Sequence, residues 1–387
     1  MSELVENVLY LADSYKLTHH NQYPEGTTHV YSYFESRGGK FPEVCFFGLQ
    51  YILKRWLVGR VVTHEMIDEA KAFYNLHFKM DVFNESGWRH IVDKHGGCLP
   101  LRIKAVPEGS VVPIKNVLFT IENTDPEVPW LTNWFETLLV QTWYPMTVCT
   151  ISRAYKQLIA RYLHITSDSM EGLPFKLHDF GYRGSTSVES AGIGGAAHLV
   201  NFMGTDTIAG LQLCRKYYSC EMAGFSIPAT EHSTITTWKR EGEVAAFRNM
   251  LQQYPKGSIS VVSDSYDVFH AVSTIWGEEL REEVIERGKR GCLVIRPDSE
   301  QRMVNNGKHW IVPLSQVHES RLLPKNIEIA FERMKFALDR HVNGDECYEE
   351  QFKRLQREKE AKANRKRELH RKKRKEAEDM SEGSSVE

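Results

Sequence analysis

The 387-residue sequence predicts an α/β fold of the barrel type, preceded by an N-terminal α+β part. After residue 150, short apolar runs end in charged residues, as buried parallel strands do in such folds. The clearest runs are residues 258–262 and residues 292–295. Segments with helical periodicity, residues 152–162 and 242–254, alternate with these runs, and this alternation is typical of α/β domains.

Residues 1–150 mix helices and strands instead. Residues 46–57 and 130–143 predict helices. In the second helix, apolar side chains recur at helical spacing and would form one face toward a core. That face consists of Trp134, Phe135, Leu138 and Leu139. Residues 103–121 alternate as strands do, with a turn at residues 107–109, so the first domain is predicted to be α+β and the second, residues 151–299, to be the barrel part.

The end of the chain has a different composition. Residues 351–375 contain thirteen Lys and Arg against three Glu. The run at residues 365–375 has no aromatic and almost no apolar residue, so it cannot join a core. We interpret residues 346–387 as a charged tail, helical or disordered, and residues 300–345 as a divergent segment with one apolar-periodic stretch at residues 327–338. The tail is either a solvated surface segment or a weak nucleic-acid-binding segment that neutralises phosphates.

The cysteines and the hydropathy of the chain bear on its compartment. Seven scattered cysteines, an odd number without a Cys-x-x-Cys pair, favour reduced thiols over a disulfide framework or a cysteine zinc site. No apolar stretch approaches the length of a membrane span, and the first residues lack a basic segment followed by a long apolar run. We therefore expect a cytoplasmic protein that does not cross a membrane.

One segment, residues 176–184, gathers many chemically active side chains in a short space. Residues 175–178 predict a strand, and Gly181 and Gly184 permit a sharp turn directly after it. Arg183 would then lie at a strand tip, where α/β enzymes place their sites. Protein kinases also contain Asp-Phe-Gly, but this sequence has no His-Arg-Asp loop and no glycine-rich nucleotide loop upstream, which excludes that class.

More charged residues follow predicted helices and strands. Asp206 closes a helical stretch, and Asp264 follows the first apolar run. Arg296 and Asp298 follow the second run, and His232 lies earlier among Ser and Thr residues. A single carboxylate after a strand usually caps a helix. Several strand ends that carry both arginines and carboxylates predict instead a site for an anionic substrate with a metal or ribose partner.

A glycine-rich segment at residues 191–197 resembles a phosphate-binding loop at first sight. A P-loop needs a Lys followed by Ser or Thr after its glycines, because these side chains contact phosphate oxygens and Mg²⁺. The segment lacks that pair, so we predict that its glycines permit close packing of a helix against a neighbour.

Several further motifs, taken with these segments, resemble one enzyme family. The motifs are Asp13-Ser14-Tyr15-Lys16, Tyr31-Ser32-Tyr33-Phe34-Glu35, Phe47-Gly48-Leu49-Gln50-Tyr51, Ile103-Lys104-Ala105-Val106-Pro107-Glu108-Gly109 and Glu122-Asn123-Thr124-Asp125. In this order, over residues 8–299, the chain resembles the nicotinamide phosphoribosyltransferases of the type II phosphoribosyltransferase group. The resemblance implies that family's α/β barrel, here incomplete, because the family's later motifs are absent after Ser299.

The resemblance implies a reaction and its partners. Enzymes of this family are pentosyltransferases that make nicotinamide mononucleotide and pyrophosphate from nicotinamide and phosphoribosyl pyrophosphate in NAD salvage. A homodimer with shared sites is implied, in which Phe180 and, from the second subunit, Tyr15 clamp the flat base. Arg183 would contact the pyrophosphate through its planar guanidinium. Asp206 would accept a hydrogen bond from the nicotinamide amide and repel the carboxylate of nicotinic acid.

The resemblance also assigns the remaining site residues. His232 corresponds to a histidine at the pyrophosphate site that ATP can phosphorylate. Asp264 and Asp298 suit ribose or Mg²⁺, and Arg296 suits a phosphate. We therefore expect His232, Arg183 and Asp298 to be catalytic and the whole set to bind substrate.

Two alternatives stay open at this point. In the first, the chain is a truncated form that is inactive or depends on a partner, because the family's later barrel strands and phosphate loop are not found in it. In the second, the chain is a nicotinate phosphoribosyltransferase, which the carboxylate of Asp206 disfavours through like-charge repulsion.

Overall fold

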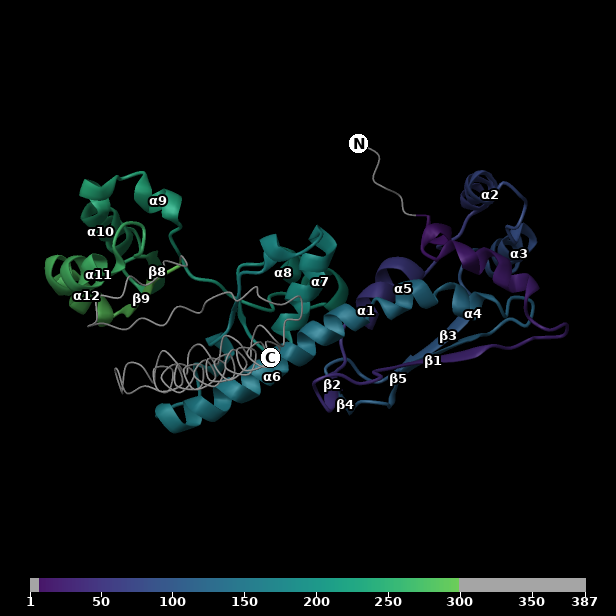
Figure 1. The fold of residues 1–387 in the computed structure, drawn as a ribbon, viewed down its shortest axis with the longest axis horizontal. Helices are drawn as coiled ribbons and strands as arrows, with labels where there is room; N and C mark the ends of the chain where they lie inside the picture. Colours follow the sequence, from purple (N-terminus) through teal and green to yellow (C-terminus); the bar gives the residue numbers. More distant parts are fainter. Residues whose placement is uncertain (1–6, 299–387) are drawn as a thin grey trace, which may run out of the picture. The chain divides into compact units, whose positions relative to one another are not determined.

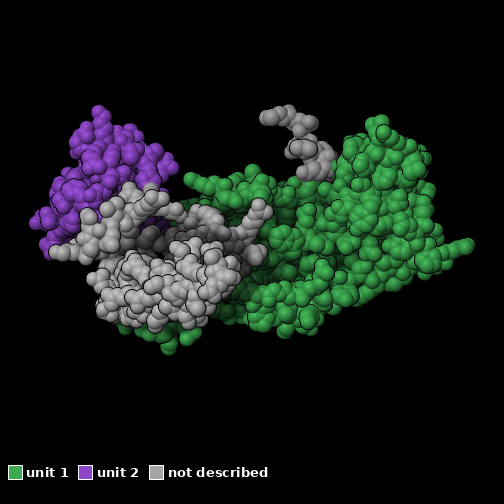
Figure 2. Space-filling view, in the orientation of Figure 1, with its two compact units in different colours: residues 1–226 green, residues 227–387 purple. Residues whose placement is uncertain are grey.

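The computed structural model describes residues 7–298, which belong to two compact units. The units divide the chain into Met1–Ser226 and Ile227–Glu387 (Figure 2). The predictions for residues 300–345 and for the tail at residues 346–387 lie outside the described residues. One helix, α6 (Trp143–Thr166), runs through the position of the domain boundary expected after residue 150, and the domain limits stay a prediction.

The N-terminal α+β part of the first unit contains an antiparallel sheet (Figure 1). Its strands lie in the order β1 (Tyr31–Glu35), β5 (Val117–Asn123) and β3 (Leu101–Ala105). A second antiparallel pair joins β2 (Glu43–Cys45) to β4 (Val111–Pro113). The strand prediction for residues 103–121 is confirmed. At the predicted turn, Gly109 has a φ of +86°, a backbone conformation that glycine adopts without strain.

The helices of the first unit cover a wide range of lengths. The α-helices are α1 (Leu49–Ile52), α2 (His64–Phe78), α3 (Glu85–His95), α4 (Leu131–Trp134), α5 (Glu136–Val140), α6, α7 (Val188–Leu199) and α8 (Ile208–Tyr218). The 3₁₀ and π-helical segments are η1 (Val8–Tyr10), η2 (Ser14–Asn21), η3 (Leu53–Leu57), η4 (Leu173–Phe175) and η5 (Tyr182–Gly184). Within residues 7–298, no helix combines the length and the apolarity that a membrane span needs.

Two predicted helices differ from their expected bounds. The helix expected from residue 46 begins at Leu49, because the φ of +109° at Gly48 is not helical. Glycine is required there, since a Cβ would lie 2.2 Å from Pro145 Cγ. The helix expected over residues 130–143 is interrupted at Phe135, where ψ is 6°, and ends as α5. The apolar face predicted for this segment is confirmed, since its four side chains are all buried.

Three tryptophans fix α3 to the segment that follows β5. Trp88 of α3 lies edge-on to Trp130 and Trp134, with ring centroids 5.0 and 5.2 Å apart. All three side chains are buried. Such aromatic pairs contribute about 0.5–1.5 kcal/mol each beyond the area that they bury, so this end of the unit is well anchored.

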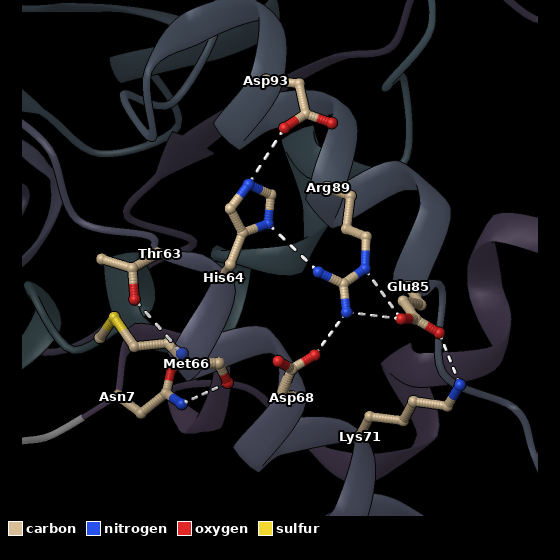
Figure 3. A network of polar contacts seen from close by, with 9 residues as sticks. All are labelled: Asn7, Thr63, His64, Met66, Asp68, Lys71, Glu85, Arg89 and Asp93. Atoms are coloured by element: carbon tan, nitrogen blue, oxygen red, sulfur yellow. Dashed lines mark hydrogen bonds and ion pairs between the residues drawn. The ribbon is translucent and has the colours of Figure 1, made fainter.

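A polar network joins α3 to α2 on the outside of this core (Figure 3). Arg89 of α3 donates from Nε to Glu85 at 2.8 Å and contacts Asp68 of α2 through a terminal nitrogen. Its other terminal nitrogen lies 3.1 Å from His64 Nδ1. Because arginine can only donate, Nδ1 is the acceptor, and the Nε2–H of His64 faces Asp93 at 3.1 Å. The network therefore sets both the position of α3 and the tautomer of His64.

Close helix packing explains the glycine-rich segment at residues 191–197. Gly195 of α7 faces Gly210 of α8, and a Cβ on Gly210 would approach the carbonyl carbon of Gly195 to 3.0 Å. A Cβ on Gly195 would lie 3.0 Å from Thr207 Cγ2. The prediction that these glycines serve packing is therefore confirmed.

The second unit is an α/β element with two parallel strands (Figure 1). Its strands are β8 (Gly257–Val262) and β9 (Gly291–Arg296). Its helices are α9 (His232–Thr236), η6 (Arg240–Gly242), α10 (Glu243–Gln253), α11 (Val268–His270), η7 (Ala271–Glu279) and α12 (Arg281–Gly288). The predicted strands and the α/β class are confirmed, and the described residues form no closed barrel.

One part of the strand prediction is wrong. Val261 and Val262 of β8 are fully buried, but Val294 and Ile295 of β9 are 41% and 37% exposed. In the described part of the chain, β9 has a strand neighbour on one side only. An apolar run predicts the strand correctly, but its burial depends on the neighbours that the strand acquires.

Arg287 of α12 is expected to stabilise the second unit. Its buried guanidinium donates to the carbonyls of Tyr254 at 3.0 Å and Gly257 at 2.8 Å, which join α10 to β8. We expect Arg287→Met to lower the free energy of unfolding by about 2–4 kcal/mol, because it removes a buried charged donor from backbone carbonyls of two elements. Urea denaturation would measure the change. Arg248→Met is the matched control: its ion pair with Glu283 is exposed, and a loss equal to that of Arg287→Met would contradict the assignment.

Candidate functional site

The first group of candidate residues lies at the ends of two short parallel strands in the first unit. The strands β6 (His178–Asp179) and β7 (Gly204–Thr205) pair in parallel. The prediction of a strand over residues 175–178 is mostly wrong. Phe175 ends the helical turn η4, and of these four residues only His178 lies in β6. The following turn is as predicted: the Gly181 N–H donates to Asp179 Oδ1 at 2.7 Å.

Phe180 and Asp206 come together at this edge. The Phe180 ring is 58% exposed and stacks on the His178 ring, with centroids 4.4 Å apart. His178 Nε2 lies 3.2 Å from Asp206 Oδ1, an ion-pair distance rather than an aligned hydrogen bond. The Ser226 hydroxyl donates to the same oxygen. The backbone N–H of Asp206 donates to the Asp179 carbonyl at 2.9 Å, so an aromatic face stands beside an oriented carboxylate.

Arg183 and Tyr15 complete the candidate residues of the first unit. Arg183 lies in the helical turn η5, is exposed, and makes no ion pair with any residue of the described part. Tyr15 lies in η2, is 58% exposed, and has its ring edge-on to His19 at 4.8 Å. Within residues 7–298 its ring does not contact Phe180. The side chains of Arg183 and Tyr15 are therefore both accessible to solvent.

The second group lies at the carboxyl ends of β8 and β9. Asp264 follows β8, and Arg296 and Asp298 lie at and beyond the end of β9. The chain before α9 joins this edge, because Ala229 forms a parallel bridge with Ser260. His232 is the first residue of α9. In the second unit these side chains therefore meet at one strand edge.

Asp264 is the centre of this second group. Its side chain is 2% exposed. Oδ1 lies 3.0 Å from His232 Nε2, and Oδ2 accepts the backbone N–H of Asp298 at 2.8 Å. Because a carboxylate only accepts, Nε2 of His232 carries a proton. Asp264 therefore holds the His232 imidazole and the backbone of Asp298 in fixed positions.

Arg296 and Asp298 lie on either side of this centre. Arg296 donates from a terminal nitrogen to the Thr230 carbonyl at 2.7 Å, and its Nε lies 3.6 Å from Asp298 Oδ1. Asp298 Oδ2 lies 3.7 Å from His232 Nδ1. Both carboxylate oxygens of Asp298 are therefore beyond hydrogen-bonding distance of these two neighbours, and its side chain is 46% exposed.

The donor set of the second group suits Mg²⁺ at one position. Mg²⁺ takes hard oxygen ligands, commonly one or two carboxylates together with phosphate oxygens. Asp264 uses both oxygens to hold His232 and the backbone, whereas Asp298 offers oxygens toward solvent. Asp298 therefore fits a metal ligand better than Asp264 does.

Sequence reasoning missed His178, Ser226 and Thr230 as supporting residues. His178 precedes Phe180 by two positions, and side chains at this spacing share one side of an extended segment, so its stacking could have been predicted. Ser226 reaches Asp206 from twenty residues further along the chain, and no local pattern indicates that contact.

A pocket of about 320 Å³ in the first unit is lined by none of the eight candidate residues. It is lined by residues of α1, η3 and the first half of α7 and by residues at the start of α6. Tyr51 donates to Glu189 Oε1 at 2.5 Å at its wall. Burial and this hydrogen bond raise the pKa of Tyr51 above its ordinary value, so its hydroxyl stays protonated.

Two family models match parts of the chain. Residues 7–103 match the family model described as Nicotinamide phosphoribosyltransferase, N-terminal domain, and residues 175–320 match the Nicotinate phosphoribosyltransferase (NAPRTase) family. The second match continues past Ser299, where the motifs that carry the resemblance end. A human Nicotinic Acid Phosphoribosyltransferase structure is similar at a TM-score of 0.48 and 16% identity, covering 84% of this chain and 65% of that chain.

Three relatives are named Nicotinamide phosphoribosyltransferase. The Xanthomonas campestris pv. campestris protein is 55% identical over 298 residues, which cover 76% of this chain and 63% of that protein. The Acinetobacter baylyi protein is 35% identical, over 76% of this chain and 62% of that protein. The Mycoplasma pneumoniae protein is 32% identical, over 78% of this chain and 69% of that protein.

These matches, to a nicotinamide phosphoribosyltransferase N-terminal domain and to the NAPRTase family, relate the chain to the phosphoribosyltransferases. The chain belongs to the nicotinamide phosphoribosyltransferase family. It spans less than two thirds of the length of the first two relatives.

Proposed function

We propose that the protein makes nicotinamide mononucleotide and pyrophosphate from nicotinamide and phosphoribosyl pyrophosphate, a pentosyltransferase step of NAD salvage. The observation that carries this proposal is the exposed Phe180 ring beside the oriented carboxylate of Asp206. A flat, uncharged base with an amide N–H fits this pair, because its ring can stack on Phe180 while its amide donates to Asp206. Family membership supports the same reaction.

The phosphate-bearing substrate needs cations. We propose that Arg183 binds the pyrophosphate, since its guanidinium has five donors and makes no competing ion pair with residues 7–298. Arg296 is assigned to a phosphate group. Stabilising the departing pyrophosphate is the main catalytic task, because the ribosyl transition state resembles an oxocarbenium ion and negative charge develops on the leaving group.

His232 is assigned to ATP coupling. With Nε2–H directed at Asp264, Nδ1 of the neutral imidazole carries the lone pair. Nδ1 would attack the γ-phosphorus of ATP, the bond to the β-phosphate oxygen would break, and ADP would leave. Mg²⁺, held by Asp298 and phosphate oxygens, would neutralise charge on the phosphates.

The assembly is also a proposal. The family resemblance implies a homodimer in which the partner subunit's Tyr15 completes the base clamp, and the exposed Tyr15 ring of this chain is accessible to a second copy. The cytoplasmic location and the weak nucleic-acid binding of the tail, both expected from the sequence, stay predictions.

One assay tests the proposed reaction. The purified chain would be supplied with nicotinamide, phosphoribosyl pyrophosphate, Mg²⁺ and ATP, alone and mixed with the part of the Xanthomonas campestris relative that this chain does not match. Formation of nicotinamide mononucleotide in either arm supports the proposal, and formation only in the mixture supports a partner-dependent form. No product in both arms, or a preference for nicotinic acid, would overturn it.

The choice of base is expected to depend on Asp206. Asp206→Asn removes the negative charge that repels the carboxylate of nicotinic acid, so preference for nicotinamide over nicotinic acid should fall by about tenfold or more. Competition between the two bases in steady state measures this ratio. Glu221→Gln, an exposed carboxylate of the same unit, should leave the ratio unchanged. An unaltered ratio in Asp206→Asn would remove the role.

A further inference from the structure

A cluster of nitrogen and oxygen donors in the first unit includes none of the candidate site residues. His90 Nε2 and His95 Nε2 lie 2.9 and 2.6 Å from one oxygen, Asp125 Oδ2. One ligating atom from each of the three residues lies within 4.8 Å of the others. Lys94 Nζ lies 3.0 Å from the same oxygen. Three nitrogens therefore converge on a single carboxylate oxygen.

Asp125 is held in place independently of the histidines. Its side chain is 2% exposed, and its other oxygen, Oδ1, accepts the backbone N–H of Glu127 at 3.0 Å. The buried Asn123 side chain donates to the Asp125 carbonyl at 2.8 Å. Partners of this kind orient a carboxylate ligand before a metal arrives. Only Oδ2 faces the histidines.

The two histidines lie on a helix that is fixed on two sides. Trp88 holds α3 in the tryptophan core, and the Arg89 network of Figure 3 joins α3 to α2. His90 and His95 are 29% and 28% exposed, so an ion can reach them from solvent. A rigid helix presenting partly exposed imidazoles is a suitable support for a metal site.

We propose that His90, His95 and Asp125 bind a divalent transition-metal ion of the Zn²⁺ type, with solvent in the remaining position. Two imidazoles and one carboxylate are a common zinc ligand set. With metal–ligand bonds near 2.0–2.2 Å, tetrahedral ligand atoms lie about 3.4 Å apart. The N–O separations of 2.9 and 2.6 Å would therefore have to widen by about 0.5 and 0.8 Å, which side-chain rotation of the partly exposed histidines allows.

Lys94 is the competitor for this position. Its side chain is 54% exposed, and its flexible stem lets the ammonium move into solvent when an ion takes its place. Metal binding would then tie the end of α3 to the segment after β5 more firmly than the ammonium does. The expected role is structural, and it does not depend on the proposed reaction.

The test uses the full chain, stripped of metal with a chelator. Zn²⁺ titration should raise its thermal midpoint, and Co²⁺ should produce the visible absorption of a tetrahedral site. We expect Lys94→Met to bind Zn²⁺ at least tenfold more tightly, because the competing ammonium is gone. His90→Ala and His95→Ala should each weaken binding at least tenfold. His77→Ala, an exposed histidine of α2, should bind as the unaltered chain does.

Each outcome decides the proposal. Equal Zn²⁺ affinity in the unaltered chain, His90→Ala and His95→Ala would show that the metal binds elsewhere and would overturn it. Absence of Zn²⁺ binding in Lys94→Met would show that the cluster is only an ion-pair group. If the histidine variants fail to fold, the Lys94→Met variant still decides the proposal, because it is expected to bind Zn²⁺ more tightly than the unaltered chain does.

Discussion

Arg183→Ala is expected to reduce formation of nicotinamide mononucleotide by about a hundred- to a thousandfold, the effect that loss of one donor to a developing negative charge has in other enzymes. The Arg183 side chain is exposed in the turn η5, so its removal breaks no packing. The loss should therefore fall on turnover and on binding of phosphoribosyl pyrophosphate, while the thermal midpoint stays unchanged. Steady-state assays with each substrate varied would measure it.

Two further variants distinguish the effect of the planar guanidinium from the effect of its charge and from the loss of an exposed arginine elsewhere in the unit. Arg183→Lys keeps the charge but loses the planar fork, so we expect activity between that of the unaltered chain and that of Arg183→Ala. Arg161→Ala removes an exposed arginine from α6 of the same unit and should have no effect. Full activity in Arg183→Ala, in the arm where the unaltered chain is active, would end the assignment of Arg183 to the pyrophosphate.

The second candidate group could be predicted from the sequence because of strand geometry. Parallel strands end at the same edge, so residues that follow β8 and β9 had to be neighbours once both strands formed. This reasoning placed Asp264 and Asp298 correctly. It could not assign their separate roles, because these depend on burial: Asp264 is enclosed and Asp298 is half exposed.

Contacts between distant segments were beyond the reach of local patterns. His90 and His95 are five positions apart, which is no common metal spacing on a helix, and Asp125 follows thirty residues later. Their meeting depends on how α3 packs against the tryptophans after β5. In the same way, apolar spacing predicted the buried face at residues 130–143, but the break at Phe135 depends on its tertiary surroundings.

Asp264→Asn is expected to lower the ATP-dependent phosphorylation of His232 by about 10²–10⁴-fold, the range for losing a carboxylate that orients a catalytic imidazole. An asparagine oxygen can accept from the Asp298 N–H or from His232 Nε2–H, but its NH₂ group then faces the other donor. The imidazole would rotate or take the other tautomer, which places the proton on Nδ1, the nitrogen that must attack phosphorus.

The experiment measures acid-labile phosphate on the chain after incubation with labelled ATP, with nicotinamide mononucleotide formation as a second readout. Glu282→Gln, an exposed carboxylate of α12, should match the unaltered chain in both. Asp264 is a positioning residue in this scheme, so loss of phosphate labelling should exceed any loss of unassisted turnover. If Asp264→Asn is labelled normally and melts at the same temperature, the contact with His232 serves only to hold α9 against β8, and ATP coupling would need another nucleophile.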